Sequence, residues 1–256
     1  MIDSLGVVMN YYNEIFKRKS FHLFRNTEII SDDELSEIRE YLKTVKVLDD
    51  TIKTDFRIVP ENETTCRRGA QYCIELYTEE KGDYLRNIGY IGEQIDLWLA
   101  GRNIGALWFG IGKPDYQDAD GLSYVIMIAI AKMPESSFRK DMFKAKRKSL
   151  DEVWRGELIE GVSNIVRFAP SACNSQPWIV ENSDGGLSVF RYKKPGKRGI
   201  MPANKVPFYN RIDIGIFLCV LEICLKQQGQ NFERELFHDE GNDDEMTLNA
   251  KYFLEK

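Results

Sequence analysis

The chain has 256 residues, of which 43% are hydrophobic and 29% charged, proportions typical of a soluble globular protein rather than a disordered one. Its formal net charge of −5 argues against a nucleic acid as partner. Its five cysteines include no pair at metal-ligand spacing and its histidines number only two, so we expect no metal site and reduced, buried thiols.

Apolar residues recur at helical spacing in four parts of the chain and predict a helix in each. The predicted helices cover residues 33–46, 88–99, 151–168 and 216–224, the last ending at Gly229. Ser31 and Glu34 form a capping box before the first of them.

Four further segments carry the composition of β-strands. They are residues 72–77, 124–131, 178–181 and 187–192. The second is an almost unbroken apolar run, which indicates a central strand buried on both faces. The acidic residues between 239 and 245 read as a solvated tail or loop.

The sequence resembles two degenerate copies of one unit. The triplet Arg-Lys-Ser occurs at residues 18–20 and again at 147–149, each time before a predicted amphipathic helix. A later apolar helix carries Ile-Asp-Leu at 95–97 in the first copy and Ile-Asp-Ile at 212–214 in the second. We therefore divide the chain into halves at residues 1–145 and 146–256, sharing one core.

Residues 169–178, APSACNSQPW, form what we call the polar loop. Pro170 and Pro177 restrict its backbone, and the residues between them are small or polar. Such a loop can hold one face of a planar cofactor with backbone and side-chain donors. The same pattern is equally typical of a turn that ends a helix before a strand.

Three basic clusters could bind a phosphate monoester, which needs guanidinium groups, an ammonium group and hydroxyl or backbone donors. They are residues 18–20 with His22, residues 146–149, and Arg67 with Arg68. Each cluster alone is typical of a solvated surface, and their occurrence together with the polar loop favours a site.

Four segments resemble signatures of the nitroreductase superfamily, most closely the branch in which two half-copies are fused in one chain. They are RKSFHLF at 18–24, the polar loop, KRKSLDEV at 146–153, and the helix and loop at 87–112. The resemblance implies an α+β fold in which a mostly antiparallel sheet is flanked by helices. It also implies that one chain mimics the usual homodimer and holds a single FMN at the junction of its halves.

The resemblance assigns the cofactor contacts residue by residue, with no catalytic side chain and no metal ligand. It implies that the phosphate and pyrimidine side of FMN is held by Arg18, Lys19 and Ser20, joined at the phosphate by Arg147. It implies that Gly110, Ile111 and Gly112 lie along the flavin ring. It also implies that the second half contributes Pro170, Ser171 and Asn174. The family usually has Arg or Lys where this chain has His22, which we retain as a candidate cofactor contact.

The function implied is an FMN-dependent oxidoreductase that passes two electrons from NAD(P)H, through the flavin N5, to a nitroaromatic, a quinone or a similar electron-poor acceptor. One alternative is an FMN-binding storage or sensor protein without turnover. Another makes Cys173 the nucleophile of a hydrolase with His22 as its base. The expected partner is a small-molecule acceptor, not a nucleic acid or a membrane. We expect a cytoplasmic monomer by internal duplication, with a dimer left open.

Overall fold

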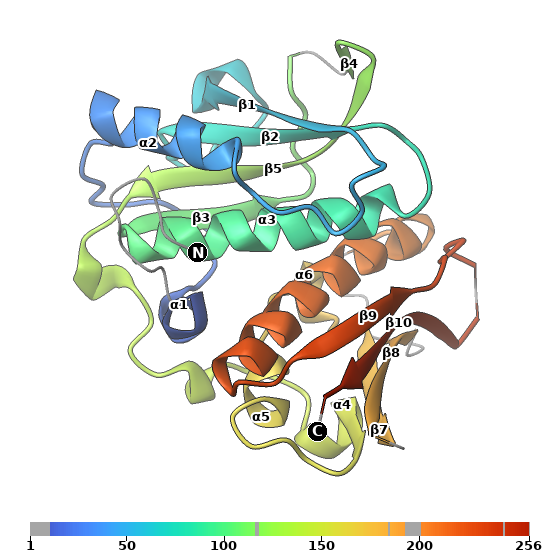
Figure 1. Ribbon diagram of the computed structural model, residues 1–256. Coiled ribbons are helices and arrows are strands. Elements are labelled where there is room, and N and C mark those ends of the chain that lie inside the picture. The colour runs from blue at the N-terminus through green and yellow to red at the C-terminus, as the bar shows by residue number, and fades with distance from the viewer. Residues whose placement is uncertain (1–10, 116–117, 184, 193–200, 243, 256) are drawn as a thin grey trace. The chain divides into compact units, whose positions relative to one another are not determined.

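The computed structural model describes residues 11–115, 118–183, 185–192, 201–242 and 244–255 (Figure 1). It divides into two compact units. Unit 1 comprises residues 1–84 and 91–142, and unit 2 comprises residues 85–90 and 143–256. The helix α3 (Tyr84–Gly101) contributes to both, because its residues 85–90 belong to unit 2. Within the described ranges, no helix is long and apolar enough to cross a lipid bilayer.

Unit 1 is built on an antiparallel sheet in the order β1-β2-β5-β3, with β4 paired to β5 (Figure 1). Its elements are α1 (Tyr11–Lys17), α2 (Asp32–Leu42), β1 (Thr54–Pro60), β2 (Tyr72–Thr78), β3 (Ile104–Phe109), β4 (Asp118–Ala119) and β5 (Leu122–Lys132), with short 3₁₀ turns at Glu61–Glu63 and Glu135–Ser137. A further 3₁₀ turn, Met142–Lys144, lies where the chain passes from unit 1 to unit 2. The predicted central strand is confirmed: β5 lies between β2 and β3, and its residues 125–131 are all buried.

The capping box before α2 forms as predicted. The Ser31 hydroxyl accepts a hydrogen bond from the Glu34 backbone at 3.2 Å, and the Glu34 carboxylate accepts one from the Ser31 backbone at 3.0 Å. The helix ends at Leu42, four residues before the predicted end at Lys46. Its apolar face, including Leu35 and Ile38, is buried as the spacing required.

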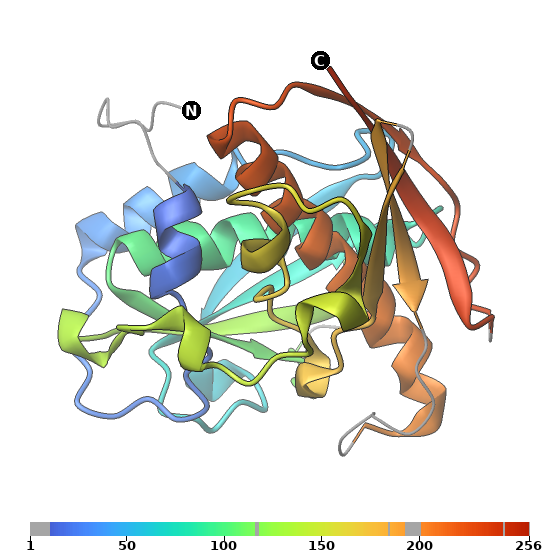
Figure 2. The ribbon, with the colours of Figure 1, turned by 90° about the horizontal axis from the view of Figure 1, so that it is seen from below.

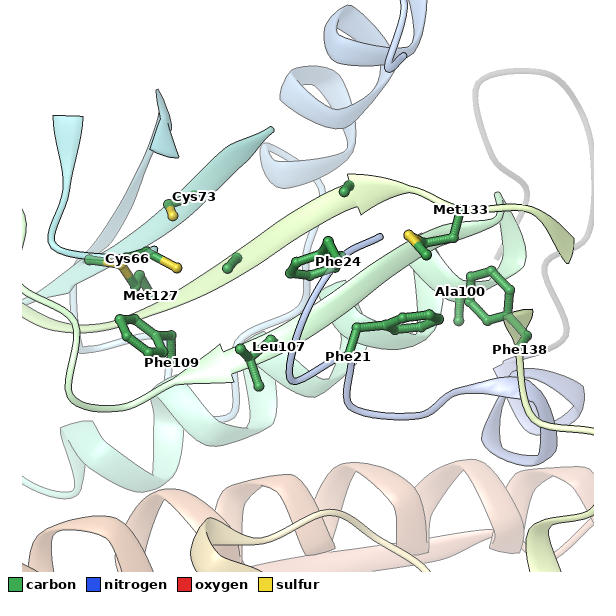
Figure 3. Close-up of a cluster of buried hydrophobic side chains, with 12 residues drawn as sticks. Phe21, Phe24, Cys66, Cys73, Ala100, Leu107, Phe109, Met127, Met133 and Phe138 are labelled. Atoms are coloured by element: carbon green, nitrogen blue, oxygen red, sulfur yellow. The ribbon is translucent and has the colours of Figure 1, made fainter. Parts of the chain in front are cut away.

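A cluster of buried apolar side chains anchors the segment that follows Arg18 (Figure 3). Phe21 and Phe24 both lie in this cluster, with their rings stacked 5.9 Å apart. Phe21 also meets Phe138 edge to face at 5.2 Å, and its backbone N–H donates to the carbonyl of Ala106 at 3.0 Å. The aromatic residues of the RKSFHLF motif therefore fix its backbone, which positions the polar residues just before them.

Unit 2 has a sheet in the order β6-β7-β8-β10-β9, antiparallel except where β6 runs parallel to β7. Its elements are α4 (Leu150–Val153), β6 (Trp154–Gly156), α5 (Ser163–Val166), β7 (Trp178–Ser183), β8 (Gly186–Tyr192), α6 (Val206–Gln227), β9 (Phe232–Leu236) and β10 (Met246–Leu254), with 3₁₀ turns at Ala172–Asn174 and Ala203–Lys205. Figures 1 and 2 both show α6 alongside the strands of this sheet. The predicted α+β class, with mostly antiparallel strands flanked by helices, is confirmed.

The single helix predicted over residues 151–168 is wrong. The chain forms only two short helices there, α4 and α5, with the strand β6 between them. Gly156 has a φ of +85°, and a Cβ on it would lie 2.0 Å from the carbonyl oxygen of Asn182 in β7. The parallel pairing of β6 with β7 therefore takes this segment out of helical geometry, which its apolar spacing could not indicate.

The prediction that residues 239–245 are solvated is wrong for Asp239, which is 1% exposed. Its carboxylate accepts two hydrogen bonds from the guanidinium of Arg191, at 2.6 and 2.9 Å, and one from the Asn249 amide at 3.0 Å. These contacts lower the pKa of Asp239 below its usual range against the opposing effect of burial. The segment joins β9 to β10, and the buried ion pair fixes it to β8.

Candidate functional site

Arg18 lies directly after α1 and is almost completely buried, at 3% exposure. Its Nη2 atom is 3.0 Å from the Oδ2 of Asp96, which lies on α3. The same carboxylate accepts a hydrogen bond from the Trp108 indole in β3 at 3.1 Å. Arg18 also donates to the Ser20 hydroxyl at 3.4 Å. The arginine and the serine of the first RKS triplet are thus joined to α3 and β3 inside unit 1.

The charge of Arg18 is stabilised from within the fold. Burial lowers its pKa, but the carboxylates of Asp96 and Glu93 outweigh burial and raise it above its usual range. The Nε atom of Arg18 is buried and, among the described residues, has no hydrogen-bond partner. Arg18 therefore stays cationic and keeps one donor that none of the described residues accepts from.

A cation that the sequence reasoning missed, Arg139, joins this group. Its backbone N–H donates to the carbonyl of Lys17 at 3.1 Å. Burial and repulsion by Arg18 lower the pKa of Arg139 to about 10, and burial together with Arg139 lowers that of Lys19. We call Arg18, Lys19 and Arg139 the basic group. Arg139 stands in no recognisable motif, and only the fold brings it next to the RKS triplet.

The basic group has hydrogen-bonding capacity to spare. Neither the guanidinium of Arg139 nor the ammonium of Lys19 donates a hydrogen bond to any residue that the structure describes, and Lys19 instead lies over the Phe21 ring at 4.6 Å. Within the described residues, the ion pair that the group forms is the one between Arg18 and Asp96. The group holds three cations, and two carboxylates, Asp96 and Glu93, act on Arg18, so a net positive charge remains that is expected to attract an anion.

Other predicted basic residues make only local contacts or none. His22 is exposed and forms no hydrogen bond within the described part of the chain, so the structure does not join it to the basic group. Arg67 donates to the Thr64 carbonyl at 2.6 Å, and Arg68 lies 5.6 Å over the Phe109 ring. The Arg67–Arg68 pair thus supports the turn after the Glu61–Glu63 segment.

The predicted glycine loop follows β3 directly. The Gly112 backbone N–H donates to Phe109 at 3.0 Å, and its carbonyl accepts from the Tyr124 hydroxyl at 3.1 Å. A Cβ on Gly112 would lie 2.7 Å from the Met127 sulfur, so packing within unit 1 already requires this glycine. Ile111 is 73% exposed at the tip of the loop.

In unit 2, the polar loop holds three non-glycine residues in the left-handed region. Cys173, Asn174 and Gln176 have φ values of +51°, +55° and +50°. Residues in this conformation persist only where their surroundings hold them, because each is strained by about 1 kcal/mol or more. The Asn174 side chain accepts from Arg147 at 3.0 Å and donates to the Lys146 carbonyl at 3.1 Å. The structure therefore brings Arg147 and Asn174 together, and their contact with a cofactor stays a prediction.

Two further buried side chains hold the polar loop: Lys148, from the basic cluster at residues 146–149, and Asp213, which the sequence reasoning did not select. Lys148 donates from its backbone to the Gln176 side chain at 2.8 Å and from its ammonium to the Gln176 carbonyl at 2.7 Å. The Ser171 hydroxyl accepts from the Gln176 backbone at 2.9 Å, while Pro170 is buried. The predicted residues Pro170, Ser171 and Asn174 thus lie in one cross-linked segment.

Asp213 on α6, at 2% exposure, is, after Arg139, the second site residue that the sequence reasoning missed. Its carboxylate accepts from the Ala172 backbone at 2.9 Å and from the Ser175 hydroxyl at 3.3 Å. Burial raises the pKa of Asp213 to about 7, and these two hydrogen bonds offset only part of the rise. The Ile-Asp-Ile triplet was a visible signal, but its meaning required knowing what the aspartate contacts.

The structure gives the hydrolase alternative no support. Cys173 is exposed, and its thiol hydrogen-bonds to none of the described residues. A nucleophilic cysteine needs a base within hydrogen-bonding reach, held in turn by a third group.

Comparisons with known proteins agree with the motifs. The model of the family described as "Putative TM nitroreductase" matches residues 10–224. A crystal structure of a "putative nitroreductase" from Thermotoga maritima is 18% identical, with a TM-score of 0.60 and coverage of 98% of both chains. A nitroreductase family protein from Clostridium novyi NT is 20% identical over 50% of this chain and 87% of its own, with a TM-score of 0.39. A search of curated proteins found no match.

Proposed function

Because the chain belongs to the family described as "Putative TM nitroreductase", whose model its residues 10–224 match, we propose that it is an FMN-dependent oxidoreductase. The proposed electron donor is NAD(P)H, and the proposed acceptor is a small electron-poor molecule such as a nitroaromatic or a quinone. The observation that carries the cofactor proposal is the basic group, in which the Arg139 guanidinium and the Lys19 ammonium donate no hydrogen bond to any described residue.

The basic group fits a phosphate monoester. Such a phosphate carries close to two negative charges and several acceptor oxygens, which guanidinium groups match best. Arg139 and Lys19 have donors without hydrogen bonds to described residues, and Arg18 is fixed next to them by Asp96. We propose that these cations, with the Ser20 hydroxyl, hold the FMN phosphate.

The polar loop is the proposed second contact for FMN. Its strained backbone is held in one conformation by Arg147, Lys148 and Asp213, so its donors are pre-oriented. The expectation that one FMN is contacted by residues of both units stays a prediction. It requires that one chain binds one equivalent of FMN. Variants in the basic group and variants in the polar loop must both weaken the binding of that one FMN.

Bound FMN would supply two-electron redox chemistry between NAD(P)H and the acceptor. The work proposed for the protein is to bind the phosphate, to orient the ring and to keep the surrounding donors fixed. Cations near the pyrimidine side of the ring would also favour its reduced, anionic form, which is the electrostatic part of the proposal. We assign no side chain a proton-transfer role.

The cofactor proposal is tested by comparing FMN with riboflavin, which lacks the phosphate. We expect Arg139→Gln to weaken FMN binding about 10- to 100-fold, because a charge-assisted hydrogen bond is lost. Riboflavin binding is expected to stay within about twofold of the wild-type value, since riboflavin offers no anion. Dissociation constants from quenching of flavin fluorescence give the comparison.

The matched control for this prediction is Lys140→Gln. Lys140 is exposed and directly follows Arg139. Each variant loses one positive charge, so the long-range attraction between the protein and the FMN phosphate is reduced equally in both. We expect Lys140→Gln to bind FMN like the wild type. Equal weakening of FMN binding by both variants, or no weakening by Arg139→Gln, would remove Arg139 from the phosphate site.

A further inference from the structure

Two buried aspartates on apolar helices have different partners. Asp96, on α3, is paired with the Arg18 guanidinium at 3.0 Å. Asp213, on α6, forms hydrogen bonds only with the uncharged Ala172 backbone and Ser175 hydroxyl, among the residues that the structure describes. Burying a carboxylate without a neighbouring cation costs folding free energy. Such a residue therefore points to a structural feature that its hydrogen bonds stabilise in return.

What Asp213 holds is the strained part of the polar loop. Ala172 precedes Cys173 and Asn174, which both have positive φ, and Ser175 precedes Gln176, which has positive φ as well. The two hydrogen bonds from the loop to Asp213 therefore bracket the two left-handed residues. The other contacts that hold this part of the loop involve Asn174, through Arg147 and the Lys146 carbonyl, and Gln176, through Lys148 and the Ser171 hydroxyl. None of them engages Ala172 or Ser175.

The charged and titratable side chains of the unit-2 elements around α6 have other partners. They include Arg86 with Asn249, Arg167 with Asn164, Arg191 with Asp239, Arg211 with the Pro207 carbonyl, Tyr90 and Arg234 with Glu222, Lys205 over the Phe208 ring, and Tyr209, which lies one turn before Asp213 and whose own pKa is raised by burial and by the Cys173 thiol. Among the described residues, none of these groups shifts the pKa of Asp213, which is set by burial and by the hydrogen bonds to Ala172 and Ser175. Within unit 2, the state of the Asp213 carboxylate thus depends on burial and on the loop.

We propose that Asp213 is a positioning residue whose ionised carboxylate holds the polar loop in its strained conformation, and that its protonation releases the loop. The part of this inference that concerns FMN rests on the proposed function. The part that concerns the loop does not, because it follows from the contacts of Asp213 alone.

The direction of the pH dependence follows from linkage. Both hydrogen bonds lower the pKa of Asp213, so they form more strongly to the ionised than to the protonated carboxylate. Because the pKa of Asp213 is about 7, the loop is held above this pH and loosens below it. The contribution of Asp213 to the free energy of unfolding changes with pH in the opposite direction. It falls as the pH rises from 3.8 towards 7, because the Asp213 carboxyl ionises near pH 3.8 in the unfolded chain but only near pH 7 in the folded one.

The test is hydrogen–deuterium exchange of the peptide that covers residues 169–177, measured from pH 6 to pH 8 and corrected for intrinsic exchange rates. In the wild type we expect protection to increase about tenfold across this range. In Asp213→Asn we expect protection to stay at the low-pH level throughout. Protection of β7 serves as the internal reference, and it should not change between the two proteins.

Ser175→Ala is the second variant, because it removes one donor and keeps the buried charge. It should lower protection above pH 7 by less than Asp213→Asn and retain the pH dependence, since the Ala172 bond remains. Wild-type protection that does not vary with pH, or Asp213→Asn protection equal to wild type at pH 8, would overturn the proposal.

FMN binding separates this inference from the proposed function. If the wild type binds FMN, Asp213→Asn should weaken binding about tenfold at pH 8 and leave it unchanged at pH 6. If the wild type binds no FMN, the proposed function fails, while the exchange experiment still decides the role of Asp213. Bound FMN together with exchange that is insensitive to Asp213 would overturn only the positioning role.

Discussion

Replacing Gly215 with alanine is expected to destabilise unit 2 by about 3 kcal/mol or more. A Cβ on Gly215, in α6, would lie 1.9 Å from the Arg86 carbonyl oxygen and 2.7 Å from the Tyr90 backbone nitrogen. The contact is reciprocal, because a Cβ on Gly89 would lie 1.9 Å from the Ile212 carbonyl oxygen. These are backbone atoms of helices, so no side-chain rotation relieves the clash. Denaturant unfolding followed by circular dichroism measures the loss.

The control for this prediction is Gly121→Ala. No atom lies within 4 Å of a Cβ on Gly121, so the substitution adds only the strain of a φ of +80°, about 1 kcal/mol. If Gly215→Ala unfolds at the same denaturant concentration as Gly121→Ala, then α6 does not approach residues 85–90 as closely as described.

Replacing Arg18 with methionine is expected to destabilise unit 1 by about 3–5 kcal/mol. The reason is that Asp96, only 1% exposed, would keep a buried charge without its cation. FMN binding would be lost with it, because Arg18 belongs to the basic group. Chemical denaturation gives the stability, and fluorescence titration gives the affinity for FMN.

The double variant Arg18→Met/Asp96→Asn separates the two effects. Asparagine removes the unpaired charge and keeps an acceptor for the Trp108 indole, so most of the stability is expected to return. FMN affinity is not expected to return, because the guanidinium is still absent. A double variant that regains wild-type FMN affinity would show that Arg18 acts on the fold and not on the cofactor.

Local signals in the sequence were sufficient for the elements that depend on local chemistry. The capping box at Ser31 and Glu34 set the start of α2, and the apolar run of residues 124–131 identified the buried central strand. The helix predicted over 151–168 is wrong because the conformation of Gly156 is imposed by Asn182, on a neighbouring strand. Asp239 was misread for a similar reason, since its buried partner Arg191 is distant in sequence.

Sequence motifs marked part of the candidate site, whose contact with a cofactor stays a prediction. The first RKS triplet and the polar loop were both identified, and Arg147 does contact Asn174. Arg139 and Asp213 were not selected, because an isolated arginine and an aspartate in an apolar helix become informative only once the fold supplies their neighbours. His22 was included by motif position alone, and its exposure leaves it outside the basic group.

The central claim, that this protein is an FMN-dependent oxidoreductase, is tested most directly by one visible absorption experiment. The purified protein is mixed with FMN, separated from free flavin, and recorded anaerobically before and after addition of NADPH or NADH. We predict a protein-bound flavin band that bleaches with at least one of the two nucleotides. A bound band that bleaches with neither would contradict the oxidoreductase and favour a storage or sensor protein, and the absence of any bound flavin would contradict the cofactor itself.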